Sequence, residues 1–171
     1  SKNSLPKALA FTFVADEENM GLGMEHLVEN YLPSLPSKPF LGIFMEPTEE
    51  VIGISHKGYT WYELKIEGLA AHGSRPEQGI NAIFPMEFAL AELSKINEEL
   101  LHAEPHPHLG HATLHPGMIS GGTAQSVIAA EATIKWERRT LPGETDKELD
   151  EELQRVVSAV LKAPGNHKVT G

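Results

Sequence analysis

The sequence predicts a short parallel α/β segment followed by an α+β domain with an antiparallel sheet. Residues 8–15 and 40–45 are near-continuous apolar runs, which suit parallel strands that are buried on both faces. From Ser55 onward, apolar residues instead alternate with polar ones, as in antiparallel strands with one solvated face. This change of pattern near residues 51–56 predicts two domains, residues 1–53 and residues 54–171.

The N-terminal segment has the pattern strand, helix, strand. Residues 23–32 predict a short helix between the two apolar runs, and Pro33 and Pro36 end it. Two parallel strands cannot cover both of their own faces. We therefore expect residues 1–48 to belong to a larger α/β domain whose other strands lie outside this chain.

Acidic residues follow both apolar runs. Glu17 and Glu18 come after the first run, and Glu46 comes after the second. Since ligands bind at the carboxyl ends of parallel strands, we expect these three carboxylates to lie close together. Three neighbouring carboxylates repel one another, and a divalent metal would relieve the repulsion and leave one carboxylate free to act as a base. The alternative is a solvated acidic loop that caps the next helix.

The C-terminal domain has the element order of a ferredoxin-like fold, βαββαβ, with two helices on one face of a four-stranded sheet. The expected helices begin at Asn81, with an apolar stripe, and at a capping box formed by Thr145 and Glu148. The strands and helices are expected, in order, at residues 59–66, 81–103, 112–119, 131–141, 145–163 and from residue 167 onward.

Composition excludes several classes of protein. The chain has 171 residues and a formal net charge of −10, so it carries no basic footprint for nucleic acid and no basic membrane-surface patch. No apolar run is long enough to span a bilayer. The chain has no cysteine, which excludes disulfides and thiolate metal sites and favours a cytoplasmic setting.

Five histidines are concentrated in a segment rich in proline and glycine. Histidine-rich segments can bind metal ions. No pair of these histidines lies on a regular element that would fix its geometry, so a plain surface loop is the expectation. The histidines are His102, His106, His108, His111 and His115.

Six short motifs occur in order along nearly the whole chain, and together they are specific. They resemble the dinuclear zinc amidohydrolases that include acetylornithine deacetylase, succinyl-diaminopimelate desuccinylase, aminoacylase and the glutamate-type carboxypeptidases. The detail around residues 121–123 and 136–143 is most similar to the acetylornithine deacetylase branch. The motifs are residues 13–18 with Gly23, residues 46–48, residues 56–58, residues 71–76 with residues 79–82, residues 121–124 and residues 139–143.

The resemblance implies zinc-dependent hydrolysis of an amide bond in an N-acyl amino acid or short peptide. It implies a catalytic α/β domain that holds two zinc ions, for which cobalt or manganese could substitute. It also implies an inserted ferredoxin-like domain that acts as a lid and as the interface of a homodimer. Residues 1–53 would then be part of the catalytic domain, and residues 54–171 would be the lid and dimerisation domain.

The resemblance also implies roles for five residues. By position, Glu17 matches the general acid/base, Glu18 a zinc ligand and Glu46 a ligand of the other zinc. His72 matches a lid histidine that reaches a neighbouring subunit's active site and stabilises the oxyanion. Arg139 matches a residue that binds the substrate carboxylate. From the residues alone, the preferred interpretations are a loop histidine bonded to backbone for His72 and a strand-end ion pair with Glu137 or Glu144 for Arg139.

The chain departs from the family pattern in two ways. Ser126 stands where the family usually has asparagine, and the upstream His-x-Asp segment, the bridging aspartate and the late histidine are absent. We therefore expect this polypeptide to bind zinc weakly and to be inactive by itself. Two other hypotheses remain: a dimerisation module of a catalytically dead relative, and a regulatory ferredoxin-like domain that binds amino acids without metal.

Overall fold

The computed structural model describes residues 9–39, 41–165 and 167–170. The chain divides into two units, Ser1–Val51 and Ile52–Gly171, which are described separately.

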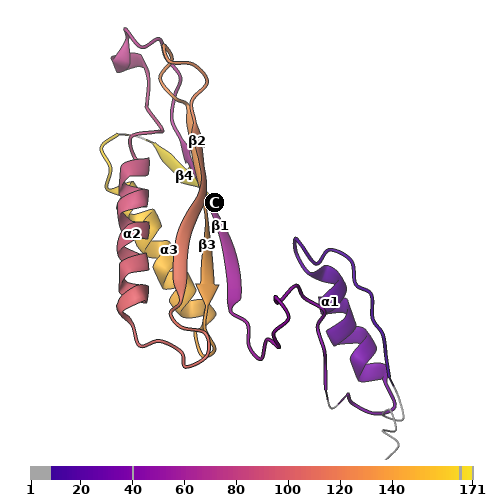
Figure 1. The fold of residues 1–171 in the computed structure, drawn as a ribbon. Helices are drawn as coiled ribbons and strands as arrows, with labels where there is room; N and C mark the ends of the chain where they lie inside the picture. Colours follow the sequence, from indigo (N-terminus) through magenta and orange to yellow (C-terminus); the bar gives the residue numbers. More distant parts are fainter. Residues whose placement is uncertain (1–8, 40, 166, 171) are drawn as a thin grey trace, which may run out of the picture. The chain divides into compact units, whose positions relative to one another are not determined.

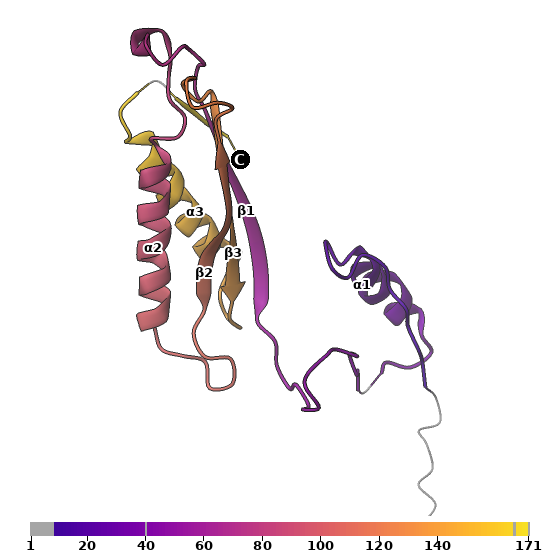
Figure 2. The ribbon, with the colours of Figure 1, turned by 45° about the horizontal axis from the view of Figure 1, so that its top comes forward.

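The second unit is a four-stranded antiparallel sheet with two helices on one face (Figures 1 and 2). The strand order across the sheet is β2-β3-β1-β4. Strands and helices follow one another in the predicted order, strand, helix, strand, strand, helix, strand. Their bounds are β1 Gly58–Glu67, α2 Met86–His102, β2 Thr113–Gly121, β3 Glu131–Thr140, α3 Asp146–Leu161 and β4 Lys168–Thr170.

The core lies between the helices and one face of the sheet. In the β1–β3 ladder, Leu64 pairs with Ile134, and both side chains are almost fully buried. Burying side chains of this size contributes about 1.5–3 kcal/mol each. The helices contribute Leu93, Ile96, Val156 and Val160 to the same hydrophobic cluster. Because side chains alternate along a strand, the residues between the buried ones form a second face of the sheet, opposite the helices.

The two helices begin where local chemistry allows. Thr145 and Glu148 form the predicted capping box at the start of α3. Helix α2 starts at Met86, later than the predicted Asn81, because Pro85 occupies the N-cap position. Proline has no N–H to donate and is tolerated only at the beginning of a helix.

The first unit contains the predicted helical segment. It consists of α1 (Leu22–His26), a wider turn with π-type hydrogen bonds (Leu27–Tyr31) and a 3₁₀ turn (Leu32–Ser34). Gly23 lets the start of this segment lie directly against the preceding chain, since a Cβ there would be 2.5 Å from the carbonyl oxygen of Ala15.

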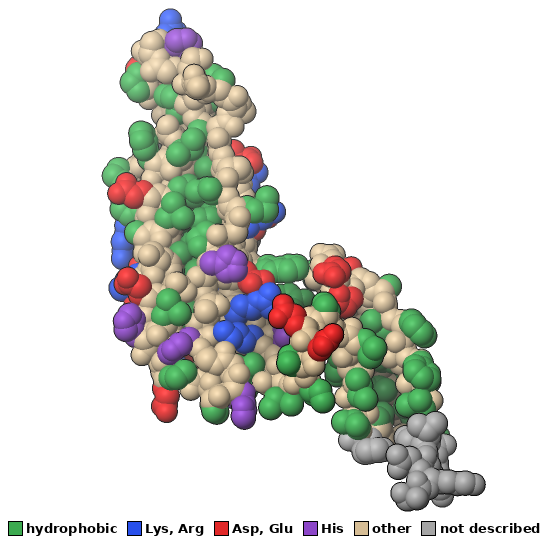
Figure 3. All heavy atoms as spheres, in the orientation of Figure 1, with side chains coloured by type: hydrophobic (Ala, Val, Ile, Leu, Met, Phe, Trp, Pro, Cys, Tyr) green, Lys and Arg blue, Asp and Glu red, His purple; other side chains and the backbone are tan. Residues whose placement is uncertain are grey.

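The two parallel strands predicted for the first unit are wrong for this chain. Ala8 and Phe40 lie outside the described residues, and residues 9–15 and 41–45 are not strands. Their large hydrophobic side chains are on the surface (Figure 3), with Phe13 97% and Met45 92% exposed. The physical reason is that an isolated pair of strands without neighbouring strands or a covering layer buries too little apolar surface to form.

Candidate functional site

The acidic turn after residue 15 is a closed loop organised by Asp16. Its backbone has φ 65°, a left-handed conformation that aspartate adopts more readily than most residues. The carbonyl oxygen of Asp16 accepts a hydrogen bond from the Gly21 N–H at 2.8 Å, and its carboxylate accepts one from the Met20 N–H at 3.3 Å. The turn leaves Glu17 and Glu18 exposed as adjacent carboxylates.

The structure does not bring Glu17, Glu18 and Glu46 together. Glu46 is exposed, in a segment without regular secondary structure. Across the described residues, no three or more histidine, cysteine, aspartate or glutamate side chains form a group that could hold a metal ion. The expected convergence fails because it depended on two paired strands ending at one edge. Carboxylates suit a divalent cation chemically, but within the part of the chain that the structure describes these three do not form such a group.

His72 lies in a loop that pairs with a second loop far along the chain. The Gly73 N–H donates to the Ser126 carbonyl oxygen at 2.8 Å, and the Ile128 N–H donates to the Ala71 carbonyl oxygen at 2.9 Å. A bridge between His72 and Val127 lies between these two bonds. The pairing fixes His72 beside Ser126, the position where the sequence departs from the family pattern.

The imidazole of His72 has one bonded nitrogen and one exposed edge. Nδ1 accepts a hydrogen bond from the Ser74 N–H at 3.2 Å and lies 2.8 Å from the Ser74 hydroxyl. A ring nitrogen that accepts from an amide carries no proton, so the neutral ring is protonated on Nε2. His72 is therefore both a loop histidine bonded to backbone and an exposed N–H donor.

An open groove of about 430 Å³ lies on the second unit. One side comes from the loop that carries His72, through Ala70, and another from the loop with Val127 and Ile128. The rest comes from the Gly-Gly-Thr segment singled out in the sequence and from the start of β3. The lining residues in these parts are Ser120, Gly121, Gly122, Thr123, Ala130, Glu131, Ala132 and Thr133.

Arg139, at the end of β3, is held by Glu137 and by an aromatic ring. Its Nε donates to Glu137 Oε1 at 2.7 Å, and its guanidinium carbon lies 5.3 Å from the centre of the Tyr59 ring. The ion pair with Glu137 is one of the two that the sequence left open. Hydrogen bonds from Arg139 and Trp61 lower the pKa of the Glu137 carboxyl below its ordinary value, against the effect of desolvation.

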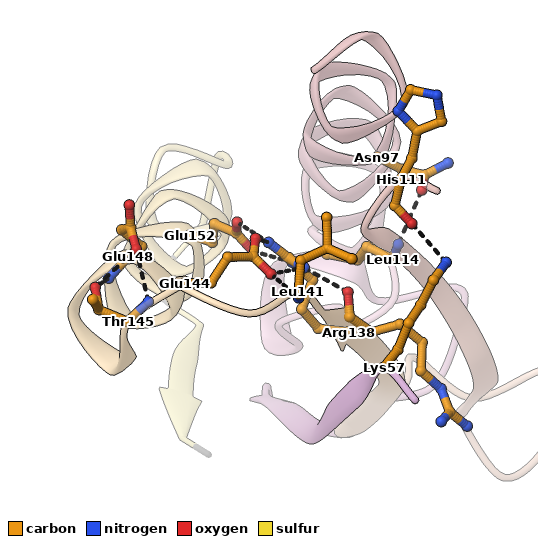
Figure 4. A network of polar contacts seen from close by, with 11 residues as sticks. Lys57, Asn97, His111, Leu114, Arg138, Leu141, Glu144, Thr145, Glu148 and Glu152 are labelled. Carbon is orange, nitrogen blue, oxygen red and sulfur yellow. Dashed lines mark hydrogen bonds and ion pairs between the residues drawn. The ribbon is translucent and has the colours of Figure 1, made fainter. Parts of the chain in front are cut away.

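The neighbouring Arg138 points to the opposite face and is buried, with 1% of its surface exposed. Its guanidinium donates to Glu144 Oε1 at 2.5 Å and to Glu152 Oε2 at 2.9 Å (Figure 4). Burial acts to lower the pKa of Arg138, but the hydrogen bonds to Glu152 and Glu144 outweigh it and raise the pKa above its ordinary value. Sequence reasoning missed this residue, although it continues the inward alternation of Ile134 and Trp136.

The histidine-rich segment closes on itself through backbone contacts. Nδ1 of His106 accepts hydrogen bonds from the His108 and Leu109 N–H groups, each at 3.2 Å. His106 also forms a bridge with Gly110. His106 thus has a structural role in the loop.

Among the helices of the described residues, none combines the length and the apolar character that crossing a bilayer requires.

Three comparisons relate the chain to known proteins. A family model described as the peptidase dimerisation domain of the M20 type matches residues 54–164. The chain is 32% identical over 167 residues to an acetylornithine deacetylase of Vibrio atlanticus, and this alignment covers 96% of this chain and 43% of that protein. It is 33% identical over 159 residues to a probable carboxypeptidase of Aspergillus flavus, and this alignment covers 90% of this chain and 37% of that protein. The chain thus spans less than half the length of these relatives.

Among solved structures, an amidase of the hydantoinase/carbamoylase family from Burkholderia ambifaria superposes with a TM-score of 0.51 at 18% sequence identity. The superposition covers 67% of this chain and 27% of the amidase. At this identity the comparison shows a shared fold.

Proposed function

Because the chain belongs to the M20 family of amidohydrolases and metallopeptidases, we propose that it forms part of an enzyme that hydrolyses the amide bond of an N-acyl amino acid or short peptide. The observation that carries the proposal is the alignment with an acetylornithine deacetylase over 96% of this chain. That alignment includes the acidic turn of the first unit as well as the dimerisation domain. Residues 1–53 would belong to the catalytic domain, and residues 54–171 to a ferredoxin-like lid.

Glu18 and Glu46 would supply two of the ligands for a pair of zinc ions, and residues outside this chain would supply the others. Two zinc ions provide Lewis acidity that activates water and polarises the amide carbonyl. Glu17 would accept the proton of the attacking water and pass it to the leaving amine. Its exposed position on the Asp16 turn, next to Glu18, supports this role. This chain by itself would bind zinc weakly and would not turn over substrate.

His72 would stabilise the negative charge that develops on the carbonyl oxygen. Its Nε2–H is free to donate because Nδ1 already accepts the Ser74 N–H. Removing one such donor typically costs about 3 kcal/mol of transition-state stabilisation. In a homodimer this group would act in the active site of the neighbouring subunit.

The lid would form the homodimer through α2 and the edge strand β2. Hydrophobic side chains lie along the surface over β2 and beside α2 (Figure 3). Large apolar side chains remain exposed next to or on both elements: Ile83, Phe84, Leu90, Leu101, Met118 and Ile119. Pairing one patch with its own copy around a two-fold axis covers both at once.

Zinc dependence of the intact enzyme tests the catalytic assignment. We expect removal of metal to abolish hydrolysis of a panel of N-acyl amino acids and zinc to restore it. Glu18→Ala and Glu46→Ala should each lower the bound zinc and the rate. Glu25→Ala, which changes another exposed acid of the first unit, is the matched control and should change neither. Full zinc content and full activity in the first two variants would contradict the proposal.

The second candidate function is a dimerisation module of a catalytically inactive relative. The family model that matches is that of the dimerisation domain alone, which favours this candidate over a free amino-acid-binding domain. An intact protein whose upstream segment lacks His-x-Asp would support the second candidate.

A further inference from the structure

Four side chains form a cluster on the face of the sheet opposite the helices, named here the aromatic–arginine cluster. Tyr59 and Trp61 come from β1, and Glu137 and Arg139 come from β3. In the ladder, Tyr59 pairs with Arg139 and Trp61 pairs with Glu137. Cross-strand partners share a face, and Trp136 and Arg138, which alternate with Glu137 and Arg139 along β3, are buried on the helix side. The cluster is therefore a property of the sheet's open face.

The members of the cluster hold one another in place. Glu137 uses one carboxylate oxygen for Arg139 Nε, at 2.7 Å, and the other for Trp61 Nε1, at 2.9 Å. The guanidinium of Arg139 lies over the Tyr59 ring, and the Tyr59 and Trp61 rings lie 5.1 Å apart between centroids. One carboxylate thus orients both the cation and the indole, so the arrangement is preorganised before any ligand arrives.

The cluster offers two kinds of recognition side by side. The hydrogen bonds that Arg139 makes within the described residues use Nε only, which leaves Nη1 and Nη2 as a paired donor edge. This edge matches the two oxygens of a carboxylate. Beside this donor edge, Tyr59 is 44% and Trp61 52% exposed, so about half of each side chain is in contact with solvent. Covering them with apolar area is favourable.

We propose that the aromatic–arginine cluster selects a carboxylate ligand with an aromatic or bulky apolar side chain, namely an N-acyl aromatic amino acid. The carboxylate binds the Nη edge of Arg139, and the side chain lies against Trp61 and Tyr59. A small side chain would leave the rings wet, and a cationic side chain would lie close to the Arg139 charge. Glu137 is a positioning residue for both recognition elements. This inference rests on the proposed function for the role of Arg139 and adds the substrate class.

Tryptophan fluorescence of this chain tests the proposal directly. The chain has two tryptophans, and Trp136 is buried with 4% exposure, so added ligand at the surface reports through Trp61. Titration with N-acetylphenylalanine should change the signal and saturate. N-acetylphenylalanine amide, N-acetylalanine and N-acetylornithine should each bind about tenfold more weakly, a difference of about 1.4 kcal/mol.

Variants separate recognition from folding. Arg139→Gln should abolish binding, and Arg139→Lys, which keeps the charge but loses the paired donor edge, should weaken it strongly. Glu137→Gln should weaken binding while the Trp61 emission shifts with the loss of its partner. Lys135→Gln, on the same face of β3 and paired with Glu63, is the matched control and should bind normally. Circular dichroism of each variant confirms that the sheet is intact.

Three binding results would overturn the proposal. They are absence of saturable binding, equal affinity for N-acetylphenylalanine and N-acetylalanine, and unchanged binding by folded Arg139→Gln. Loss of self-association in Trp61→Ala would also overturn it, because it would assign the cluster to a contact between copies of the chain. Binding is measured here without turnover, so this inference can fail while the zinc-dependence test succeeds, and the reverse.

Discussion

Adjacent residues of β3 show how alternation assigns opposite roles. Arg139 lies on the open face, partly exposed, with Glu137 as its partner, whereas Arg138 is buried among Glu144 and Glu152. The carboxylate of Glu144 also accepts the Leu141 N–H at 2.5 Å. Arg138 therefore ties the end of β3, the following turn and α3 to one another.

Replacing Arg138 should be the most destabilising single change in this network. Arg138→Met would leave two carboxylates facing a buried site without a cation, which typically costs about 3–5 kcal/mol. Urea denaturation followed by circular dichroism measures the loss. The control is Arg155→Met, which removes ion pairs to Glu92 and Glu99 from a partly exposed site and should cost about 1 kcal/mol or less. Equal losses in the two variants would contradict this account.

The contribution of Glu137 in the aromatic–arginine cluster to the free energy of unfolding should decrease in acid. The folded-state pKa of Glu137 lies below its ordinary value of 4.5, so between these two values the unfolded state binds more protons than the folded state. Its contribution is fully present above about pH 5 and is lost as the pH falls through the folded-state pKa. The stability difference between wild type and Glu137→Gln, measured by urea denaturation at several pH values, should therefore shrink as the pH falls below 4.5. A difference that stays constant would show that Glu137 is not coupled to Arg139.

Predictions for single residues succeeded where the interacting partner lies nearby in the sequence. They failed where the partner comes from a distant element of the fold. The sequence offered Glu137 as a partner of Arg139, two residues away, and this ion pair is present. The burial of Arg138 depends on carboxylates from the turn and from α3, which no single-strand pattern reveals. The meeting of Glu17 and Glu18 with Glu46 depended on a parallel sheet that the described residues of the first unit do not form.

At the scale of elements, the capping box of α3 is the clearest local signal. The Glu148 N–H donates to the Thr145 hydroxyl at 3.4 Å, and the Thr145 N–H donates to the Glu148 carboxylate at 2.7 Å. The hydrogen bonds that the Thr145 N–H and the Thr145 hydroxyl donate to the Glu148 carboxylate lower the pKa of that carboxyl below its ordinary value. The two residues and their spacing are visible in the sequence, so the start of this helix could be predicted.

Removal of the cap should weaken the second unit. Thr145→Ala should lower the free energy of unfolding by about 1 kcal/mol, measured by urea denaturation. Ser158→Ala, at an exposed position within α3, is the matched control and should be neutral or slightly stabilising, since alanine has the higher helix propensity. A loss as large in the control as in Thr145→Ala would argue against a specific cap.

The strands and helices of the second unit could be predicted because their apolar residues recur at the spacing typical of each element, every second residue in a strand and every three to four residues in a helix. Alternation placed β1 and β3, and the apolar stripe placed α2, although Pro85 moved its start to Met86. In the first unit, by contrast, apolar runs indicated strands, but the described residues 9–15 and 41–45 form none. An apolar run indicates that a segment is buried in the folded protein. Burial requires neighbouring strands or helices that cover the segment, and the described residues of the first unit do not supply them.

At the scale of the whole molecule, the proposed dimer would determine which active site each His72 serves. Leu90→Arg would place a charge in the exposed apolar surface of α2 and should weaken self-association of the chain by at least about tenfold, measured by sedimentation equilibrium. Lys95→Ala changes a different face of the same helix and is the control. A chain that is monomeric at high concentration, or a Leu90→Arg variant that associates normally, would contradict the assignment of this interface.

Glu17, as the proton-transferring group of an M20 hydrolase, is the residue on which the proposed reaction depends most. The most direct measurement is the turnover number of the intact enzyme with Glu17→Gln, together with its zinc content and with Glu25→Gln as the control. We predict that zinc binding is retained and that the turnover number falls by a factor of at least about 100, the usual contribution of a general base. Normal turnover by the zinc-loaded Glu17→Gln enzyme would contradict the account.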